Sequence, residues 1–234
     1  MTWLSQLIQK VFSHIFIAQP LKWECSILMQ RKLLESLGNL LPRKKVNIIK
    51  KAYIDDAEIR IFKYNSVKSN KLIIYLHGGG FAFGLMPLHR NIANILSNVT
   101  DAEVMLVDYP LSPEAKFPSA INTSFDSYLW ALNQGYKPQN VFMAGDSAGG
   151  TLALSTLLKI KEKGIPMVGG ISLISPWGNL CNNGETIFSN VNKGDILNKK
   201  WLDMAASHYV GDADMKDPLV SPLFGCFVGF PPLH

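Results

Sequence analysis

Apolar residues follow a helical spacing in the first part of this 234-residue chain. Near the amino terminus they return every three or four positions, so that one side of a helix is apolar. A second helix is predicted between Pro20 and Gly38, because proline is favoured in a first helical turn and glycine just beyond a last one. Pro42 then interrupts the pattern. The first apolar stripe consists of Leu4, Leu7, Ile8, Val11, Phe12, Ile15 and Phe16.

This apolar stripe must be buried against another surface, and the sequence leaves open which surface that is. The helix can pack on its own domain, form part of a lid over a substrate pocket, or lie on a membrane surface. Its polar face carries little Lys or Arg, which disfavours the membrane surface. We assign residues 1–45 to an N-terminal helical cap region.

Short apolar stretches alternate with helical patterns from residue 46 onward. The stretch 72–76 is apolar throughout, which is typical of a strand covered on both faces, and Asp55 and Asp56 predict a hairpin turn. Strands that alternate with helices of this length are typical of a doubly wound, mainly parallel sheet. We therefore expect an α/β core over residues 46–234. Strands are predicted at 46–54, 57–64, 72–76, 103–108, 141–144 and 168–174, and helices at 88–98, 119–132, 147–163 and 198–209.

The regular alternation lapses after Trp177. Residues 178–193 are polar and loop-rich, and a long irregular insertion between core elements is often functional. We expect a cap insertion over about residues 178–215, next to the N-terminal helices.

The composition is that of a globular protein, with 47% hydrophobic and 18% charged residues. The formal charge of +5 comes from 23 Lys and Arg against 18 Asp and Glu. Its densest cluster runs from Arg43 to Lys51, where an edge strand is predicted and lysines prevent pairing with other chains. The cluster lacks interleaved aromatic residues, so we expect no nucleic-acid partner. No apolar run approaches the length of a bilayer, so we expect no transmembrane segment.

Three cysteines, Cys25, Cys181 and Cys226, stand at wide spacing. An odd, unpatterned set favours reduced thiols in a cytoplasmic protein over a disulfide framework. None has metal-ligand spacing, and we expect neither a metal nor an organic cofactor. The amino terminus has only Lys10 ahead of apolar residues and no clear small-residue cleavage site, which argues against a secretory signal.

A serine stands where the strand at 141–144 turns into the helix that follows it. Gly145, Ser147 and Gly149 form the Gly-x-Ser-x-Gly pattern of a nucleophile elbow. So sharp a turn crowds the residues two before and two after the serine, and glycine relieves that crowding. We predict that Ser147 is a nucleophile.

A glycine run follows the apolar strand at 72–76. His77 is followed by Gly78, Gly79 and Gly80. Glycines leave backbone N–H groups unshielded, and such donors, with the N–H of Ala148, could hold the oxygen that becomes negative when a serine attacks a carbonyl.

With both motifs in place, the chain resembles the hormone-sensitive-lipase-like branch of the α/β-hydrolases, which contains many bacterial carboxylesterases. The segment 107–114 is similar to the family's segment between the two motifs, although Pro110 stands where an arginine is usual. The likeness runs from about residue 46 to the end, through the landmarks at 175–177, 217–222 and 229–232.

The resemblance implies that Ser147 is the nucleophile and that Gly78, Gly79, Gly80 and Ala148 supply the oxyanion hole. It implies that His77 orients the glycine loop and is not the catalytic base. The remaining motif residues, Gly145, Asp146 and Gly149, are expected to support the elbow.

The acid and histidine of a catalytic triad should both follow the serine in this fold. In the family they come after a strand that the chain only reaches at Leu233 and His234, so we expect a C-terminally incomplete α/β-hydrolase whose 234 residues alone are inactive. A complete but degenerate protein is the other explanation. Residues after Ser147 that have the right chemistry are not expected to serve; they are His208, His234, Asp195, Asp203, Asp212, Asp214 and Asp217.

The expected function is hydrolysis of short- to medium-chain carboxylic esters through an acyl-enzyme. The alternative is an inactive small-molecule-binding protein on the same fold. The expected partner is a small ester substrate, and a homodimer is left open.

Overall fold

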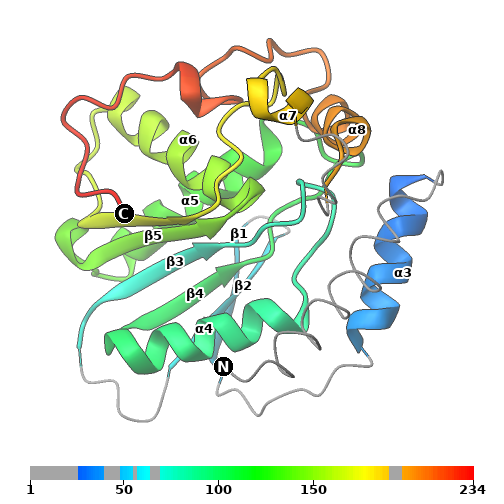
Figure 1. Ribbon diagram of the computed structural model, residues 1–234. Helices are drawn as coiled ribbons and strands as arrows, with labels where there is room; N and C mark the ends of the chain where they lie inside the picture. The colour runs from blue at the N-terminus through cyan, green and yellow to red at the C-terminus, as the bar shows by residue number, and fades with distance from the viewer. Residues whose placement is uncertain (1–25, 40–47, 55–56, 64–68, 190–196) are drawn as a thin grey trace.

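The structure, a computed structural model, describes residues 26–39, 48–54, 57–63, 69–189 and 197–234 (Figure 1). The first predicted helix, the turn at residues 55 and 56, and Cys25 lie outside the described residues. Within the described part, one sheet carries helices on both faces, with further helices beyond the carboxyl ends of its parallel strands.

The described strands form one sheet in the order β1-β2-β4-β3-β5-β6. β1 and β2 are antiparallel, as are β2 and β4, whereas β4, β3, β5 and β6 run parallel. The predicted mainly parallel, doubly wound sheet is confirmed. The bounds are β1 Ile48–Ile54, β2 Ala57–Phe62, β3 Leu72–Leu76, β4 Glu103–Val107, β5 Val141–Asp146 and β6 Gly170–Ile174.

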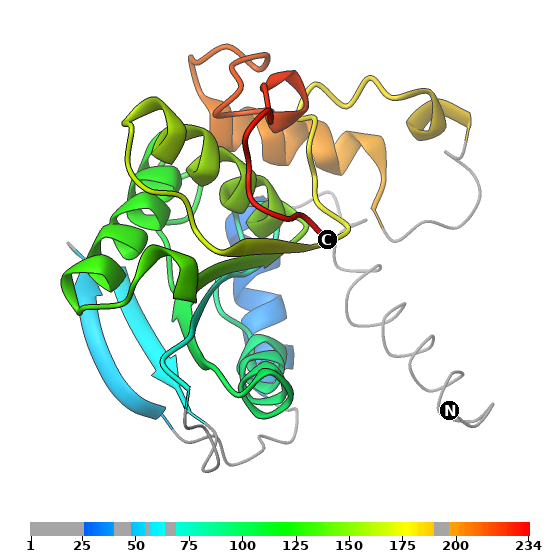
Figure 2. The same ribbon diagram turned by 90° about the vertical axis from the view of Figure 1, so that its left-hand side faces the viewer.

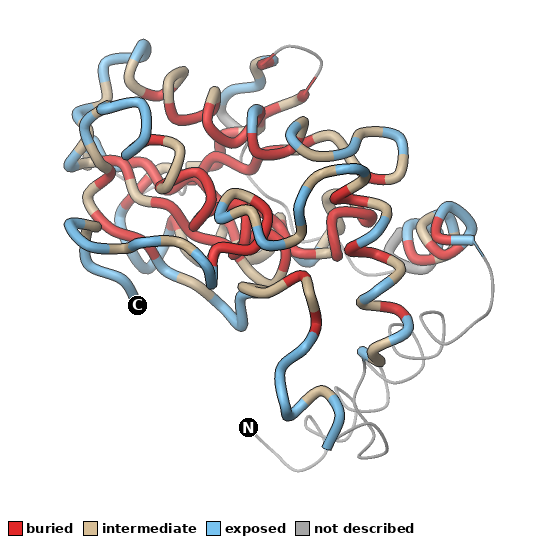
Figure 3. The backbone as a smooth tube through the Cα atoms, turned by 90° about the horizontal axis from the view of Figure 1, so that it is seen from above, coloured by how far each residue is buried: buried red, intermediate tan, exposed pale blue. Residues whose placement is uncertain are grey.

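The two faces of the sheet bury separate clusters, which explains why β3 is apolar throughout. Ile74 and Leu76 face the cluster under α5 (Ser119–Asn133) and α6 (Ala148–Glu162). Ile73 and Tyr75 face the cluster under α4 (Pro87–Thr100). Because successive side chains of a strand point to opposite faces, a strand with both faces covered has no polar side to show. Figure 3 shows the buried residues running through the strands at the centre of the molecule.

Two helices lie beyond the carboxyl ends of the parallel strands (Figure 1). They are α3 (Ile27–Asn39) and α8 (Lys199–Val210), and their side chains share one apolar cluster with Ala82 and Phe83 of the glycine loop. The prediction of loop over 178–193 missed α7 (Glu185–Ser189), because a helix of barely more than one turn has too few residues for a periodic signal.

The last residues of the chain lie alongside β6 (Figure 2). The N–H of Ile171 donates to the Pro232 carbonyl at 3.0 Å, and the N–H of Leu173 donates to the His234 carbonyl at 2.8 Å. An apolar hollow of about 660 Å³ lies on the α4 side of β5 and β6, and its lining includes Ile171, Pro232 and His234.

The turn from β5 into α6 depends on two glycines that bring backbones into contact. A Cβ added at Gly145 would lie 2.5 Å from the carbonyl of Gly149. One added at Gly149 would lie 2.0 Å from the Leu76 carbonyl oxygen and 2.6 Å from that of His77. The first turn of α6 therefore rests directly on the end of β3, which only glycine permits.

Gly149→Ala should destabilise the protein by about 3 kcal/mol or more, because its Cβ meets backbone atoms of a central strand that cannot move aside. Gly178→Ala is the matched control, since a Cβ there meets no described atom within 4 Å. Urea unfolding followed by tryptophan fluorescence measures both variants. Equal midpoints in the two variants would contradict the account of this turn.

Candidate active site

Ser147 is held at the corner between β5 and α6 in a backbone conformation that side chains avoid, with φ 50° and ψ −118°. Its N–H donates to the Ile174 carbonyl at 3.0 Å, and its own carbonyl accepts from the N–H groups of Thr151 at 3.2 Å and Trp177 at 3.1 Å. Strained conformations persist where the surroundings fix them and are concentrated at functional sites. The backbone is thus fixed while Ser147 stays partly exposed.

The glycine loop after β3 meets this corner because β3 and β5 are neighbours, with Leu76 paired to Gly145. The Gly78 N–H donates to Asp146 Oδ1 at 2.9 Å, and the Tyr75 hydroxyl donates to the same oxygen at 2.8 Å. Asp146 is the residue before Ser147. The two motifs therefore share one corner of the sheet, joined by a carboxylate.

This hydrogen bond corrects the predicted role of Gly78. Its N–H is already taken by Asp146, so the set of candidate oxyanion donors narrows to Gly79, Gly80 and Ala148. Within the described residues, no protein acceptor takes the N–H of any of these three. Gly80 and Ala148 are buried, and buried N–H groups almost always have a partner. The corner therefore presents backbone donors that suit an anionic oxygen.

Positive φ angles shape the glycine loop. They are 123° at Gly79, 59° at Gly80 and 61° at Phe81. The Gly79 carbonyl accepts from the N–H groups of Ala82 and Phe83, each at 3.0 Å. The chain thus folds back on itself, in a backbone conformation that glycine adopts at little cost.

His77 lies beneath the loop and is fully buried. Its Nδ1 lies 2.8 Å from the Gly78 carbonyl, which can only accept, so Nδ1 carries the proton. Burial, and next the ring of His89, lower the pKa of His77 to about 3. The neutral ring stacks on Tyr109 at 4.2 Å between centroids, and the Tyr109 hydroxyl donates to the His77 carbonyl at 2.6 Å. His77 is therefore placed to orient the loop and poorly suited to act as a base, and this role stays a prediction.

No side chain among the described residues hydrogen-bonds to the Ser147 hydroxyl. His208 lies on α8, and His234 pairs through its backbone with β6. The Asp217 carboxylate accepts the N–H of Leu219 at 2.8 Å and so turns the chain, as expected of an aspartate before Pro218.

The described residues contain no group of three or more His, Cys, Asp or Glu side chains that could hold a metal ion. None of the described helices has the length and apolar character that a membrane span requires.

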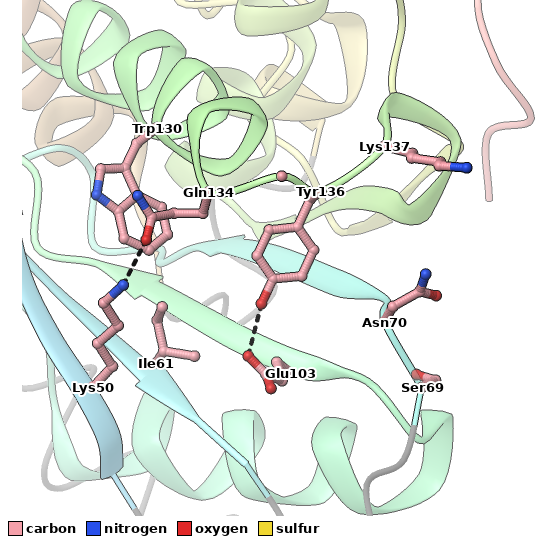
Figure 4. Close-up of a pocket in the computed structure, with 10 residues that line it drawn as sticks. Lys50, Ile61, Ser69, Asn70, Glu103, Trp130, Gln134, Tyr136 and Lys137 are labelled. Atoms are coloured by element: carbon pink, nitrogen blue, oxygen red, sulfur yellow. Dashed lines mark hydrogen bonds between the residues drawn. The ribbon is translucent and has the colours of Figure 1, made fainter.

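A polar hollow of about 440 Å³ lies at the opposite end of the strands (Figure 4). Four of its polar side chains form two pairs: Lys50 donates to Gln134 at 2.6 Å, and the Tyr136 hydroxyl donates to Glu103 at 2.7 Å. Since Glu103 begins β4 and Ser147 follows the end of β5, this hollow is separate from the serine.

Several residues that support the site are not predicted from the sequence. Tyr75 belongs to the predicted apolar strand, and its hydroxyl is the available signal, because a buried hydroxyl needs a hydrogen-bond partner. Tyr109 lies in the segment that resembles the family, yet nothing in its spacing indicates a contact with His77. Arg31, which contacts Ala82, and Trp201, which contacts Gly80, lie on helices far away in the sequence.

Stability should fall as the pH drops below about 6.5, because two histidines are buried neutral. The folded pKa is about 3 for His77 and about 4 for His89, both lowered mainly by burial. The unfolded chain binds protons below about 6.5 while the folded chain does not, so each histidine should remove about 2 kcal/mol between pH 8 and pH 5. The stabilisation is complete above the unfolded pKa and is lost on acidification.

Urea unfolding of the wild type and of His89→Gln across this pH range measures the effect. The variant should lose about half of the pH dependence. An identical slope in both proteins would contradict the assignment of a neutral, buried His89.

Comparison with known proteins agrees with this geometry. The sequence profile of a family described as "alpha/beta hydrolase fold" matches residues 73–234. An esterase of Acinetobacter venetianus is 34% identical over 206 residues, covering 86% of this chain and 67% of the relative. An acetyl-hydrolase of Streptomyces hygroscopicus is 33% identical, covering 71% of this chain and 56% of the relative. The chain thus spans about half to two thirds of the length of the curated relatives it matches.

Solved structures give the same result. An esterase from the bacterial hormone-sensitive lipase family superposes with a TM-score of 0.89 at 26% identity, over 100% of this chain and 78% of the other. EstE5, soaked by p-nitrophenyl butyrate, gives a TM-score of 0.87 at 28% identity, over 100% of this chain and 77% of the other. The resemblance seen in the motifs is confirmed: the chain belongs to the alpha/beta hydrolase fold family, in its hormone-sensitive-lipase-like branch.

Proposed function

We propose that this chain carries the nucleophile and the oxyanion hole of a serine carboxylesterase that cleaves short- to medium-chain esters. The observation that carries the proposal is the corner where Ser147, strained and partly exposed, meets a loop whose N–H groups at Gly79 and Gly80 have no protein acceptor among the described residues. The names of the relatives, esterase and acetyl-hydrolase, support an ester of a short acid as substrate.

The chemistry assigned to these groups is acyl transfer in two steps. The Ser147 oxygen attacks the ester carbonyl, and the N–H groups of Gly79, Gly80 and Ala148 stabilise the charge that develops on the carbonyl oxygen. The alcohol leaves, an acyl-enzyme forms, and water releases the acid. The base that takes the serine proton is assigned to no residue in the described part of the chain. Each oxyanion donor is expected to contribute about 3 kcal/mol to lowering the barrier.

Ser147→Ala should lower kcat/KM for p-nitrophenyl acetate and butyrate by about 10⁴-fold or more, because it removes the atom that bonds to the substrate. The measurement uses protein expressed from the complete open reading frame. Ser155→Ala is the matched control: Ser155 lies on the same helix, is fully buried, and its hydroxyl has no hydrogen-bond partner among the residues that the structure describes.

Equal rates for the wild type and Ser147→Ala would overturn the proposal. Labelling with a fluorophosphonate then separates the alternatives, since an esterase reacts at Ser147, whereas an inactive binding protein on the same fold leaves the probe untouched.

A further inference from the structure

Arg31, on α3, reaches across to the glycine loop. Its Nε donates to the Ala82 carbonyl at 2.6 Å, and its Nη2 donates to the Ser112 carbonyl at 2.6 Å. The same guanidinium donates to both carboxylate oxygens of Glu114, from Nη1 at 2.7 Å and from Nη2 at 2.9 Å. One side chain thus joins the loop after β3 to the loop after β4, and a planar fork is the group best suited to several acceptors at fixed angles.

Trp201, on α8, encloses the glycine loop from another direction. A Cβ added at Gly80 would lie 2.4 Å from Cη2 of its indole, so the ring rests directly on the glycine. The indole packs against Phe83 at 5.8 Å between centroids, and its Nε1 donates to Gln30 of α3 at 3.0 Å. α3 and α8 are therefore joined to each other at the point where both touch the loop.

The glycine loop, residues 77–83, adopts a strained backbone conformation between these two contacts. Phe81, which is not glycine, has a φ of 61°, and conformations of that kind persist only when neighbours hold them. The Phe81 carbonyl accepts from the Ser112 N–H at 2.8 Å, and Arg31 takes the adjoining carbonyls of Ala82 and Ser112. These contacts hold the two residues that directly follow Gly79 and Gly80.

We propose that Arg31 and Trp201 are positioning residues that aim the Gly79 and Gly80 N–H groups at the reacting carbonyl. The inference rests on the proposed function and deepens it: α3 and α8 act on the rate of the chemical step through the oxyanion loop, besides covering it. A purely structural role for either residue predicts lower stability with catalysis unchanged, whereas positioning predicts a fall in kcat with KM nearly unchanged.

Conservative variants distinguish the several hydrogen-bond donors of the guanidinium from its positive charge. Arg31→Lys keeps a cation for Glu114 but cannot bridge the Ala82 and Ser112 carbonyls together. Trp201→Phe keeps a ring against Phe83 but removes the donor to Gln30 and the indole edge against Gly80. Lys32→Met is the matched control, since it removes a cation from the next, exposed position of the same helix.

The experiment uses protein from the complete open reading frame and two readouts: kcat and KM for p-nitrophenyl butyrate, and hydrogen exchange of the peptide covering residues 77–83. Arg31→Lys and Trp201→Phe should each lower kcat by about 10- to 100-fold, short of the loss of a whole donor, with KM changed less than about threefold and faster exchange in the loop. Lys32→Met should match the wild type in both readouts. Melting temperatures show that each variant is folded at the assay temperature.

Wild-type kcat and wild-type loop exchange in the two variants would overturn the inference, as would a rise in KM alone, which would make Arg31 and Trp201 part of the substrate pocket only. If the wild type shows no Ser147-dependent hydrolysis of p-nitrophenyl butyrate, the proposed function is contradicted instead. The exchange measurement still decides, in that case, whether the two residues hold the loop.

Discussion

The contact between the first turn of α6 and the end of β3 is the constraint on which the rest of the site depends. Gly149 lies so close to the Leu76 and His77 carbonyls that no side chain fits between them. This approach places the residue after β5 beside the residues after β3, and it is possible only because β3 and β5 are adjacent parallel strands. Without it, Ser147 and the glycine loop would be two unrelated motifs.

The glycine loop is held from two sides by different kinds of interaction. Beneath it, Asp146 accepts the Gly78 N–H, and a neutral His77 donates to the Gly78 carbonyl. Above it, Arg31 donates to the Ala82 carbonyl, and the Trp201 ring packs against Gly80. Both sets leave the amides of Gly79 and Gly80 out of the protein's own hydrogen bonds, so that they stay available as donors in the described part of the molecule.

The sequence was sufficient to predict most of the sheet because its strands are short, apolar and separated by long helical patterns. The strand at 72–76 was predicted at its observed bounds, since both of its faces are buried and its limits coincide with Lys71 and His77. Local signals also predicted the elbow, because the crowding that demands Gly145 comes from Gly149, four residues on. Gly149 itself is demanded by the Leu76 and His77 carbonyls, which are far away in the sequence.

Contacts between residues far apart in the sequence could not be predicted from local sequence patterns. The bond from Gly78 to Asp146 depends on strand order, which no local pattern encodes, and it removed one predicted donor. Arg31 is 51 residues from Ala82, and Trp201 is 171 residues from Gln30. A single charged or aromatic residue on a helix has many possible partners, so its contact becomes visible only when the helices are placed.

The central claim, that Ser147 faces a set of free backbone donors, is tested most directly by a crystal structure of the protein after reaction with an alkyl phosphonate. The account predicts phosphorus bonded to the Ser147 oxygen, with one phosphonyl oxygen within about 3.1 Å of the nitrogen of Ala148 and of Gly79 or Gly80. A phosphonyl oxygen that points into solvent, away from all three nitrogens, would contradict it.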